Sequence, residues 1–192
     1  MWIIFTAFAV LAVPSILAWI IRIEKRNDGN ILEEESVLNI AEVNFFNQGL
    51  RIRKDLFNFT ASSYLLPSNF GDKVSGPPSA ANDGDQYTIF HTAYHGASGY
   101  VGKCCPDPHP TLTITTSDTT IFDRIEIINR PFMDFEDQDF YSRFNGSVIS
   151  VYPSTDSSSY IFQTTVTTAQ SSYMFYIHKN ETTVQTLDKF YK

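Results

Sequence analysis

The sequence predicts a mainly β protein in which two antiparallel sheets stack as a sandwich behind one N-terminal transmembrane helix. Its 192 residues include 16 Phe and 10 Tyr, and aromatic side chains favour strands. From residue 37 onward, short apolar stretches alternate with polar residues and are separated by Gly, Pro, Asn, Asp and Ser. The absence of a strongly amphipathic segment between these stretches argues against a parallel α/β sheet.

The N-terminal segment has the length and composition of a membrane span. Residues 2–21 carry no charge, and about twenty residues at 1.5 Å each cover the roughly 30 Å of a bilayer's hydrocarbon core. We therefore expect a transmembrane helix over residues 1–23. A cleaved signal peptide is the competing interpretation, but no Lys or Arg precedes the segment, and cleavage after Ala18 would put Ile16 where a small residue is preferred.

Basic residues lie on one side of this segment only. Arg22, Lys25 and Arg26 follow it, and no Lys or Arg precedes it. Because basic flanks stay on the cytosolic side, we expect a single-pass membrane protein whose β domain faces the cytosol. Cys104 and Cys105 would then remain reduced thiols.

The chain divides into four predicted regions. The transmembrane helix over 1–23 is followed by a polar stalk over 24–36, which contains a turn signal and an acidic run. The β-sandwich occupies residues 37–178, and residues 179–192 form a C-terminal tail. Eight strands are expected in the sandwich, at residues 37–46, 50–57, 87–90, 111–115, 121–128, 147–152, 160–166 and 172–177.

Charge and motifs exclude several functions. The formal net charge is -7, so nucleic acid is not an expected partner, because phosphate binding needs a clustered basic surface. The sequence holds no phosphate-binding glycine loop with Lys and no His-Glu-x-x-His, and no nucleophile is paired with a base. We therefore expect a protein that is not an enzyme and has no cofactor.

Four stretches resemble the discoidin or coagulation-factor type C domain and its fucolectin relatives. They read Leu-Asn-Ile-Ala-Glu-Val-Asn-Phe-Phe at 38–46, Gly-Pro-Pro-Ser-Ala-Ala-Asn-Asp-Gly at 76–84 followed by Phe-His-Thr at 90–92, Ile-Glu-Ile-Ile-Asn-Arg at 125–130, and Arg-Phe-Asn-Gly-Ser-Val-Ile-Ser-Val at 143–151. The resemblance spans almost the whole of the part after the stalk. It implies a discoidin-like jelly-roll β-sandwich.

The resemblance also implies a candidate ligand site. In fucolectin-like domains a His and two Arg bind vicinal sugar hydroxyls, and the matching positions here are His91, Arg130 and Arg143. The second Arg comes later in this chain than in the lectins, so the signature is incomplete. The alternative is that both Arg are structural and pair with acidic residues, which could be Asp123, Asp134 or Asp139.

Two metal sites are weaker possibilities, and neither is expected. Five potential zinc ligands lack any standard zinc spacing: His91, His95, Cys104, Cys105 and His109. Asp83 and Asp85 on either side of Gly84 could supply calcium ligands, and a plain Asp-Gly turn explains them equally well.

The sequence thus favours a non-enzymatic, membrane-anchored structural or docking protein whose partners are the lipid bilayer and other proteins of a larger assembly. By resemblance, this is similar to a minor capsid protein that links the capsid of a large DNA virus to an internal membrane. The alternative is a fucose-type, glycan-binding lectin or adhesin on the far side of the membrane.

Overall fold

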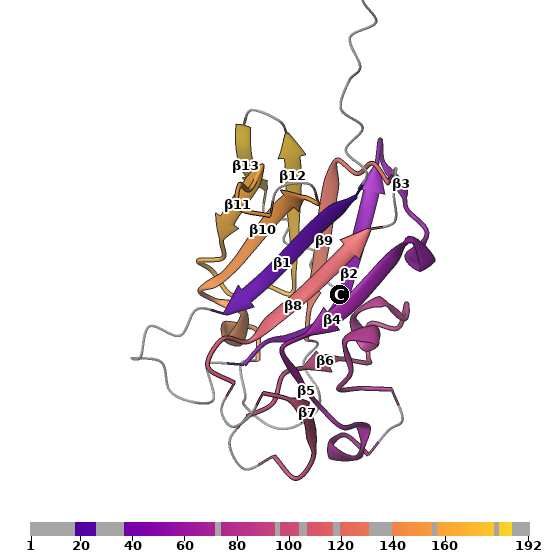
Figure 1. Ribbon diagram of the computed structural model, residues 1–192, viewed down its shortest axis with the longest axis vertical. Helices are drawn as coiled ribbons and strands as arrows, with labels where there is room; N and C mark the ends of the chain where they lie inside the picture. Colours follow the sequence, from indigo (N-terminus) through magenta and orange to yellow (C-terminus); the bar gives the residue numbers. More distant parts are fainter. Residues whose placement is uncertain are drawn as a thin grey trace, which may run out of the picture.

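Two antiparallel sheets form the layers of the molecule (Figure 1). The computed structural model describes residues 18–25, 37–71, 74–94, 97–103, 107–116, 120–130, 140–154, 157–178 and 181–185. The prediction of a mainly β fold is confirmed, and the two sheets enclose one core.

The first sheet has five strands in the order β11-β10-β1-β8-β4, and every neighbouring pair is antiparallel. β1 is its central strand, with β10 on one side and β8 on the other (Figure 1). The five strands are β1 (Trp19–Lys25), β4 (Phe57–Ala61), β8 (Thr111–Thr116), β10 (Ser147–Pro153) and β11 (Phe162–Thr165).

The second sheet follows the order β13-β12-β9-β2-β3, and β6 also pairs with β2. Its strands are β2 (Asn39–Asn47), β3 (Leu50–Arg51), β6 (Phe90–His91), β9 (Arg124–Asn129), β12 (Ser172–His178) and β13 (Glu181–Gln185). β5 (Ser63–Leu65) and β7 (Tyr100–Gly102) form a separate two-stranded ribbon at the lower end of the view in Figure 1. Short 3-10 helices connect these elements: η2 (Lys54–Leu56), η3 (Pro67–Asn69), η4 (Pro78–Asn82) and η5 (Ser142–Phe144).

Strand periodicity builds the core. On β8 and β9 every second side chain is buried, because successive side chains of a strand point to opposite faces. Phe45 of the second sheet stacks on Phe57 of the first, with ring centroids 4.1 Å apart, so the inner faces of the two sheets are in contact. Val43, Phe45, Ile125 and Ile127 make the inward side of the second sheet apolar along its middle, and Glu42 and Asn44 point to the outer side.

The prediction of a helix over 1–23 is wrong for residues 19–23. These residues belong to β1, in which Ile21 and Ile23 are completely buried in the core. Length and lack of charge suggested a span, but Arg22 and Glu24 alternate with the two isoleucines, which is the period of a strand with one buried face. The remainder of the predicted helix, residues 1–17, lies outside the described residues. Across the described ranges, none of the helices is long and apolar enough to cross a bilayer.

Other predicted boundaries also shift. Glu24 and Lys25, assigned to the stalk, end β1, and the rest of the stalk lies outside the described residues. Residues 181–185, assigned to the tail, form β13 and pair with β12, so the sheet continues past residue 178. The strand expected over 50–57 is interrupted by η2, since β3 ends at Arg51 and β4 begins at Phe57.

Candidate functional site

Strand pairing in the second sheet brings His91 and Arg130 together. His91 is the last residue of β6, Arg130 directly follows β9, and β2 lies between these two strands. Asn39 of β2 pairs with His91, and Ile40 pairs with Asn129. Residues almost forty positions apart in the sequence therefore reach the same end of the sheet.

Arg143 joins this group through an aromatic ring. It lies in η5, and the carbon at the centre of its guanidinium is 4.7 Å from the ring centre of Phe140. The same atom of Arg130 is 3.9 Å from that ring centre. Both guanidinium groups thus lie on one buried ring and within about 9 Å of each other, where two positive charges repel by roughly 2 kcal/mol at an effective dielectric constant of about 20.

Arg130 is a partly buried cation whose Nε has no hydrogen bond within the described ranges. Among the described residues that nitrogen has no partner, and no acidic side chain there forms an ion pair with this guanidinium. Burial, and secondly the charge of Arg143, lowers the pKa of Arg130 to about 10. The charged form of Arg130 is therefore held in surroundings that disfavour it.

The sequence left open that the two arginines are structural and pair with acidic residues, and one of these pairs, Arg130 with Asp123, is excluded. Asp123 and Arg130 flank opposite ends of β9, so they are too far apart to pair. Asp123 instead accepts a hydrogen bond from the backbone N–H of Gln48 at 2.7 Å. The other two acidic candidates, Asp134 and Asp139, lie outside the described residues.

His91 is buried and neutral. Its Nδ1 lies 2.7 Å from the carbonyl oxygen of Thr92, and since a carbonyl only accepts, Nδ1 carries the ring hydrogen and Nε2 is left with a lone pair. Burial lowers the pKa of His91 to about 3, and the charges of Arg130 and Arg143 act in the same direction, while the contact with Thr92 opposes them. The site thus has a hydrogen-bond acceptor at His91 beside two cationic donors.

Aromatic rings border this polar group. The ring centres of Phe70 and Tyr94 lie 6.0 and 5.8 Å from that of His91. Tyr94 is exposed, and the ring of Phe140 contacts both arginines. Apolar ring surface is therefore available next to the hydrogen-bonding groups.

Two backbone connections hold the site residues in place. Thr92 exchanges hydrogen bonds with Leu38, because its Oγ1 accepts from the Leu38 N–H at 2.9 Å and its own N–H donates to the Leu38 carbonyl at 3.0 Å. Lys25 of β1 donates from Nζ to the carbonyl of Arg143 at 2.6 Å and to that of Asn145. Lys25, counted in the sequence as a charge flanking a membrane span, is a buried link between the first sheet and η5.

This chemistry suits binding rather than proton transfer. A general base at neutral pH needs a pKa near 7, and that of His91 is about 3. Arginine side chains stay protonated and act as donors. The arrangement can therefore hold an oxygen-rich group between fixed donors and one acceptor.

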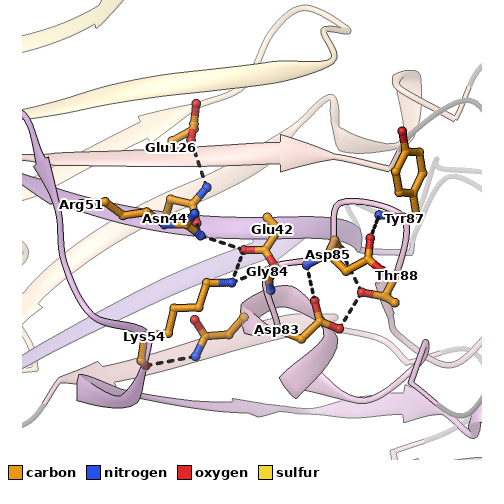
Figure 2. Close-up of polar contacts among 11 residues, drawn as sticks. Glu42, Asn44, Arg51, Lys54, Asp83, Gly84, Asp85, Tyr87, Thr88 and Glu126 are labelled. Carbon is orange, nitrogen blue, oxygen red and sulfur yellow. Dashed lines mark hydrogen bonds and ion pairs between the residues drawn. The ribbon is translucent and has the colours of Figure 1, made fainter.

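A second polar cluster, not anticipated from the sequence, lies on the outer side of β2 (Figure 2). The carboxylate of Glu42 accepts from Lys54 Nζ at 3.1 Å to both oxygens, and from the backbone N–H of Gly84. Arg51 Nη2 approaches it at 3.5 Å and also donates to Asn44. Burial raises the pKa of Glu42 against the lowering effect of the Gly84 N–H and of Lys54. This cluster ties η2 and the loop after η4 to the sheet, and its only sequence signal was an acidic residue within an apolar strand.

The calcium candidates form a self-contained turn (Figure 2). The carboxylate of Asp83 accepts from the backbone N–H of Asp85 at 2.8 Å and from the hydroxyl of Thr88 at 2.7 Å. Asp85 in turn accepts from the N–H of Tyr87 at 2.9 Å. Gly84 between them has φ +95°, a conformation that favours glycine. These contacts support the Asp-Gly turn interpretation.

Of the zinc candidates, His95, Cys104 and Cys105 lie outside the described residues. Within the described ranges no three His, Cys, Asp or Glu side chains form a group that could hold a metal ion. The histidine and arginine site is thus the site on which a functional proposal can rest.

The sequence matches no protein-family model, no curated protein and no solved structure.

Proposed function

We propose that this protein is a non-enzymatic lectin, a discoidin-like β-sandwich that binds a glycan through His91, Arg130 and Arg143. The observation that carries the proposal is the convergence of these three side chains at one end of the second sheet, with the Arg130 guanidinium lacking an ion-pair partner among the described residues. The discoidin-like part of the proposal is supported by the four ordered sequence stretches and by the two-sheet architecture that contains them.

The hydrogen-bonding character of the site favours a sugar hydroxyl over a simple anion. A sulfate oxygen could accept from Arg130 and Arg143 but has no hydrogen to give to Nε2 of His91. A hydroxyl group accepts from an arginine with its lone pairs and donates its own hydrogen to the imidazole. Two neighbouring hydroxyls would therefore use all three side chains.

Aromatic rings beside His91 also suit a sugar ligand. A sugar ring has an apolar C–H face beside its hydroxyls, and Tyr94 and Phe70 lie next to His91. The exposed ring of Tyr94 gives such a face a contact area outside the buried polar groups.

A glycan array probed with the full-length chain tests this function. We expect binding to fucosides or related glycans with vicinal hydroxyls, and its loss in Arg143→Ala and in Arg130→Ala. Arg53→Ala is the matched control, because this arginine is exposed and pairs with Asp55 away from the site. Unchanged glycan binding by Arg143→Ala would contradict the proposal, and sulfate binding without any glycan binding would indicate an anion site instead.

A docking role in a larger assembly is the second candidate. The observation that favours it is a group of exposed apolar side chains around the β5 and β7 ribbon, at the lower end of the molecule in Figure 1. Apolar side chains gathered on an exposed surface often mark a protein interface. They are Leu66, Tyr94, Tyr100 and Val101.

In this second proposal the chain is held at a membrane through its N-terminal region and contacts other proteins, as a virion protein of the minor capsid type would. Protease protection of the full-length chain in intact microsomes separates the two candidates. A domain that is digested lies on the cytosolic side, as the docking role requires. A protected domain lies in the lumen, where a secreted or displayed lectin would be.

A further inference from the structure

Asn39, the first residue of β2, has a buried polar side chain with no hydrogen-bond partner among the described residues. It is 1% exposed, and neither Nδ2 nor Oδ1 of its carboxamide has a hydrogen bond to any residue that the structure describes. Buried polar groups in folded proteins are nearly always paired, so an unpaired carboxamide points to a partner outside the chain.

Two neighbouring asparagines show how this sheet normally satisfies a buried carboxamide. Asn129 of β9 donates from Nδ2 to two backbone carbonyls and accepts at Oδ1 from the Arg130 N–H at 2.9 Å. Asn44 of β2 donates to Glu126 at 3.0 Å and accepts from Arg51. Asn39 differs from both, although it is just as deeply buried.

Asn39 lies between two of the proposed binding residues. It pairs with His91 across β2 and β6, and paired residues of antiparallel strands point to the same face. On the other side of β2, Ile40 pairs with Asn129 of β9. One residue further along each strand, Asn39 therefore lies opposite Arg130. Since Ile40 and Phe90 point into the core, Asn39 and His91 point to the outer face.

We propose that Asn39 is the floor of the glycan site and that its carboxamide both donates to and accepts from a ligand hydroxyl. This inference rests on the proposed lectin function and adds a residue that the sequence resemblance did not assign. Across three adjacent strands, about 4.8 Å apart, the site then presents an acceptor at His91, a donor and acceptor at Asn39, and a donor at Arg130.

Arg130 borders this floor, because the register of β2 and β9 places it next to Asn39. Within the described residues the Arg130 guanidinium is held by the Phe140 ring, and its Nε has no hydrogen bond. A hydroxyl bound there would meet two groups that have no hydrogen bond among the described residues, the carboxamide of Asn39 and the Nε–H of Arg130.

Asn39→Leu tests this role because it replaces the carboxamide with an apolar side chain of similar size. Titration of the full-length chain with methyl fucoside should show binding at least about tenfold weaker than in the wild type. The thermal midpoint should be unchanged or higher, since an unpaired buried carboxamide does not stabilise the fold. A residue with a purely structural role would give the opposite result for stability.

Asn129→Leu is the matched control, since it removes a carboxamide with three hydrogen bonds and should lower the thermal midpoint. If the wild type binds fucoside and Asn39→Leu binds it equally well, the inference about Asn39 is overturned and the lectin function stands. If Asn39→Leu loses binding only together with a lower midpoint, Asn39 is structural and the inference is also overturned. If the wild type binds no glycan, the lectin function itself fails.

A second measurement uses the wild-type chain and needs no substitution. The side-chain amide resonance of Asn39 in the ¹⁵N-labelled wild-type chain should shift on addition of methyl fucoside, because its N–H groups gain an acceptor. The resonance of Asn44, whose carboxamide is already paired, should stay in place. A fucoside titration that moves neither resonance contradicts direct contact with Asn39.

Discussion

Lys25 donates a hydrogen bond from Nζ to the backbone carbonyl of Arg143 at 2.6 Å, which links the last residue of β1 to the 3-10 helix that carries this proposed binding residue. The ammonium group is buried and also donates to the carbonyl of Asn145. The position of Arg143 therefore depends on a strand at the centre of the other sheet.

Replacement of this lysine should weaken both the fold and the site. In Lys25→Met the carbonyls of Arg143 and Asn145 lose their donor, and we expect a loss of about 2–3 kcal/mol in the free energy of unfolding, with weaker glycan binding. Urea denaturation and glycan titration measure the two effects. Arg22→Met, on the same strand and less buried, is the control and should lose under about 1 kcal/mol. Equal losses in the two variants would argue against the role of Lys25.

Burial of His91 should make the fold sensitive to acid. The pKa of His91 is about 3 in the folded chain, against 6.5 for the free side chain, so the unfolded chain binds the extra proton first as the pH falls. The His91 contribution to stability is complete above pH 6.5. It declines by up to about 1.4 kcal/mol per pH unit between pH 6.5 and 3.

Comparison of the wild type with His91→Asn in urea at several pH values measures this slope. The asparagine amide can still donate to the Thr92 carbonyl but does not titrate, so the stability difference between the two proteins should depend on pH over this interval. Exposed His109→Asn serves as the control and should follow the wild type. A pH-independent difference for His91→Asn would be inconsistent with a neutral, buried His91.

Glu42 should tolerate loss of its charge better than loss of its hydrogen bonds. Its pKa is raised by burial, which means that the folded surroundings disfavour the ionised form in spite of Lys54. We expect Glu42→Gln to change the free energy of unfolding by less than about 1 kcal/mol at pH 7. Glu42→Ala leaves Lys54 and the Gly84 N–H without this acceptor and should lose about 2–4 kcal/mol. A larger loss of unfolding free energy in Glu42→Gln than in Glu42→Ala would contradict this prediction.

Alanine substitutions on the two faces of β1 test whether residues 19–25 form a core strand. Ile23 is completely buried, so Ile23→Ala should lose about 2–5 kcal/mol in urea denaturation. Ile20→Ala, on the less buried side of the same strand, should lose clearly less. Similar losses at both positions would contradict the alternation on which β1 is assigned.

Local patterns in the sequence were enough to predict most strands. The alternation of Leu112 and Ile114 with threonines, and of Ile125 and Ile127 with Glu126, is a property of neighbouring residues and needs no knowledge of partners. The same alternation was present in β1, but it lay at the end of a long uncharged run and was read as part of a helix. β5 and β7 are three residues each, too short to show a period.

The candidate site was predictable in its residue types and not in its geometry. Resemblance to fucolectins selected His91, Arg130 and Arg143, although their spacing departs from that family. Nothing in the sequence indicated that Phe140 contacts both arginines, because its contact with Arg130 depends on tertiary packing.

The sequence by itself determined the mainly β class, because strand periodicity is encoded between residues two positions apart. Only the tertiary structure decided that β1 is the centre of a sheet, that Lys25 supports Arg143, and that Asn39 lies between His91 and Arg130 with no side-chain partner in the part of the chain that the structure describes. Each of these relationships depends on which distant strands pair and in which register, since pairing sets both the neighbour across the sheet and the face to which a side chain points.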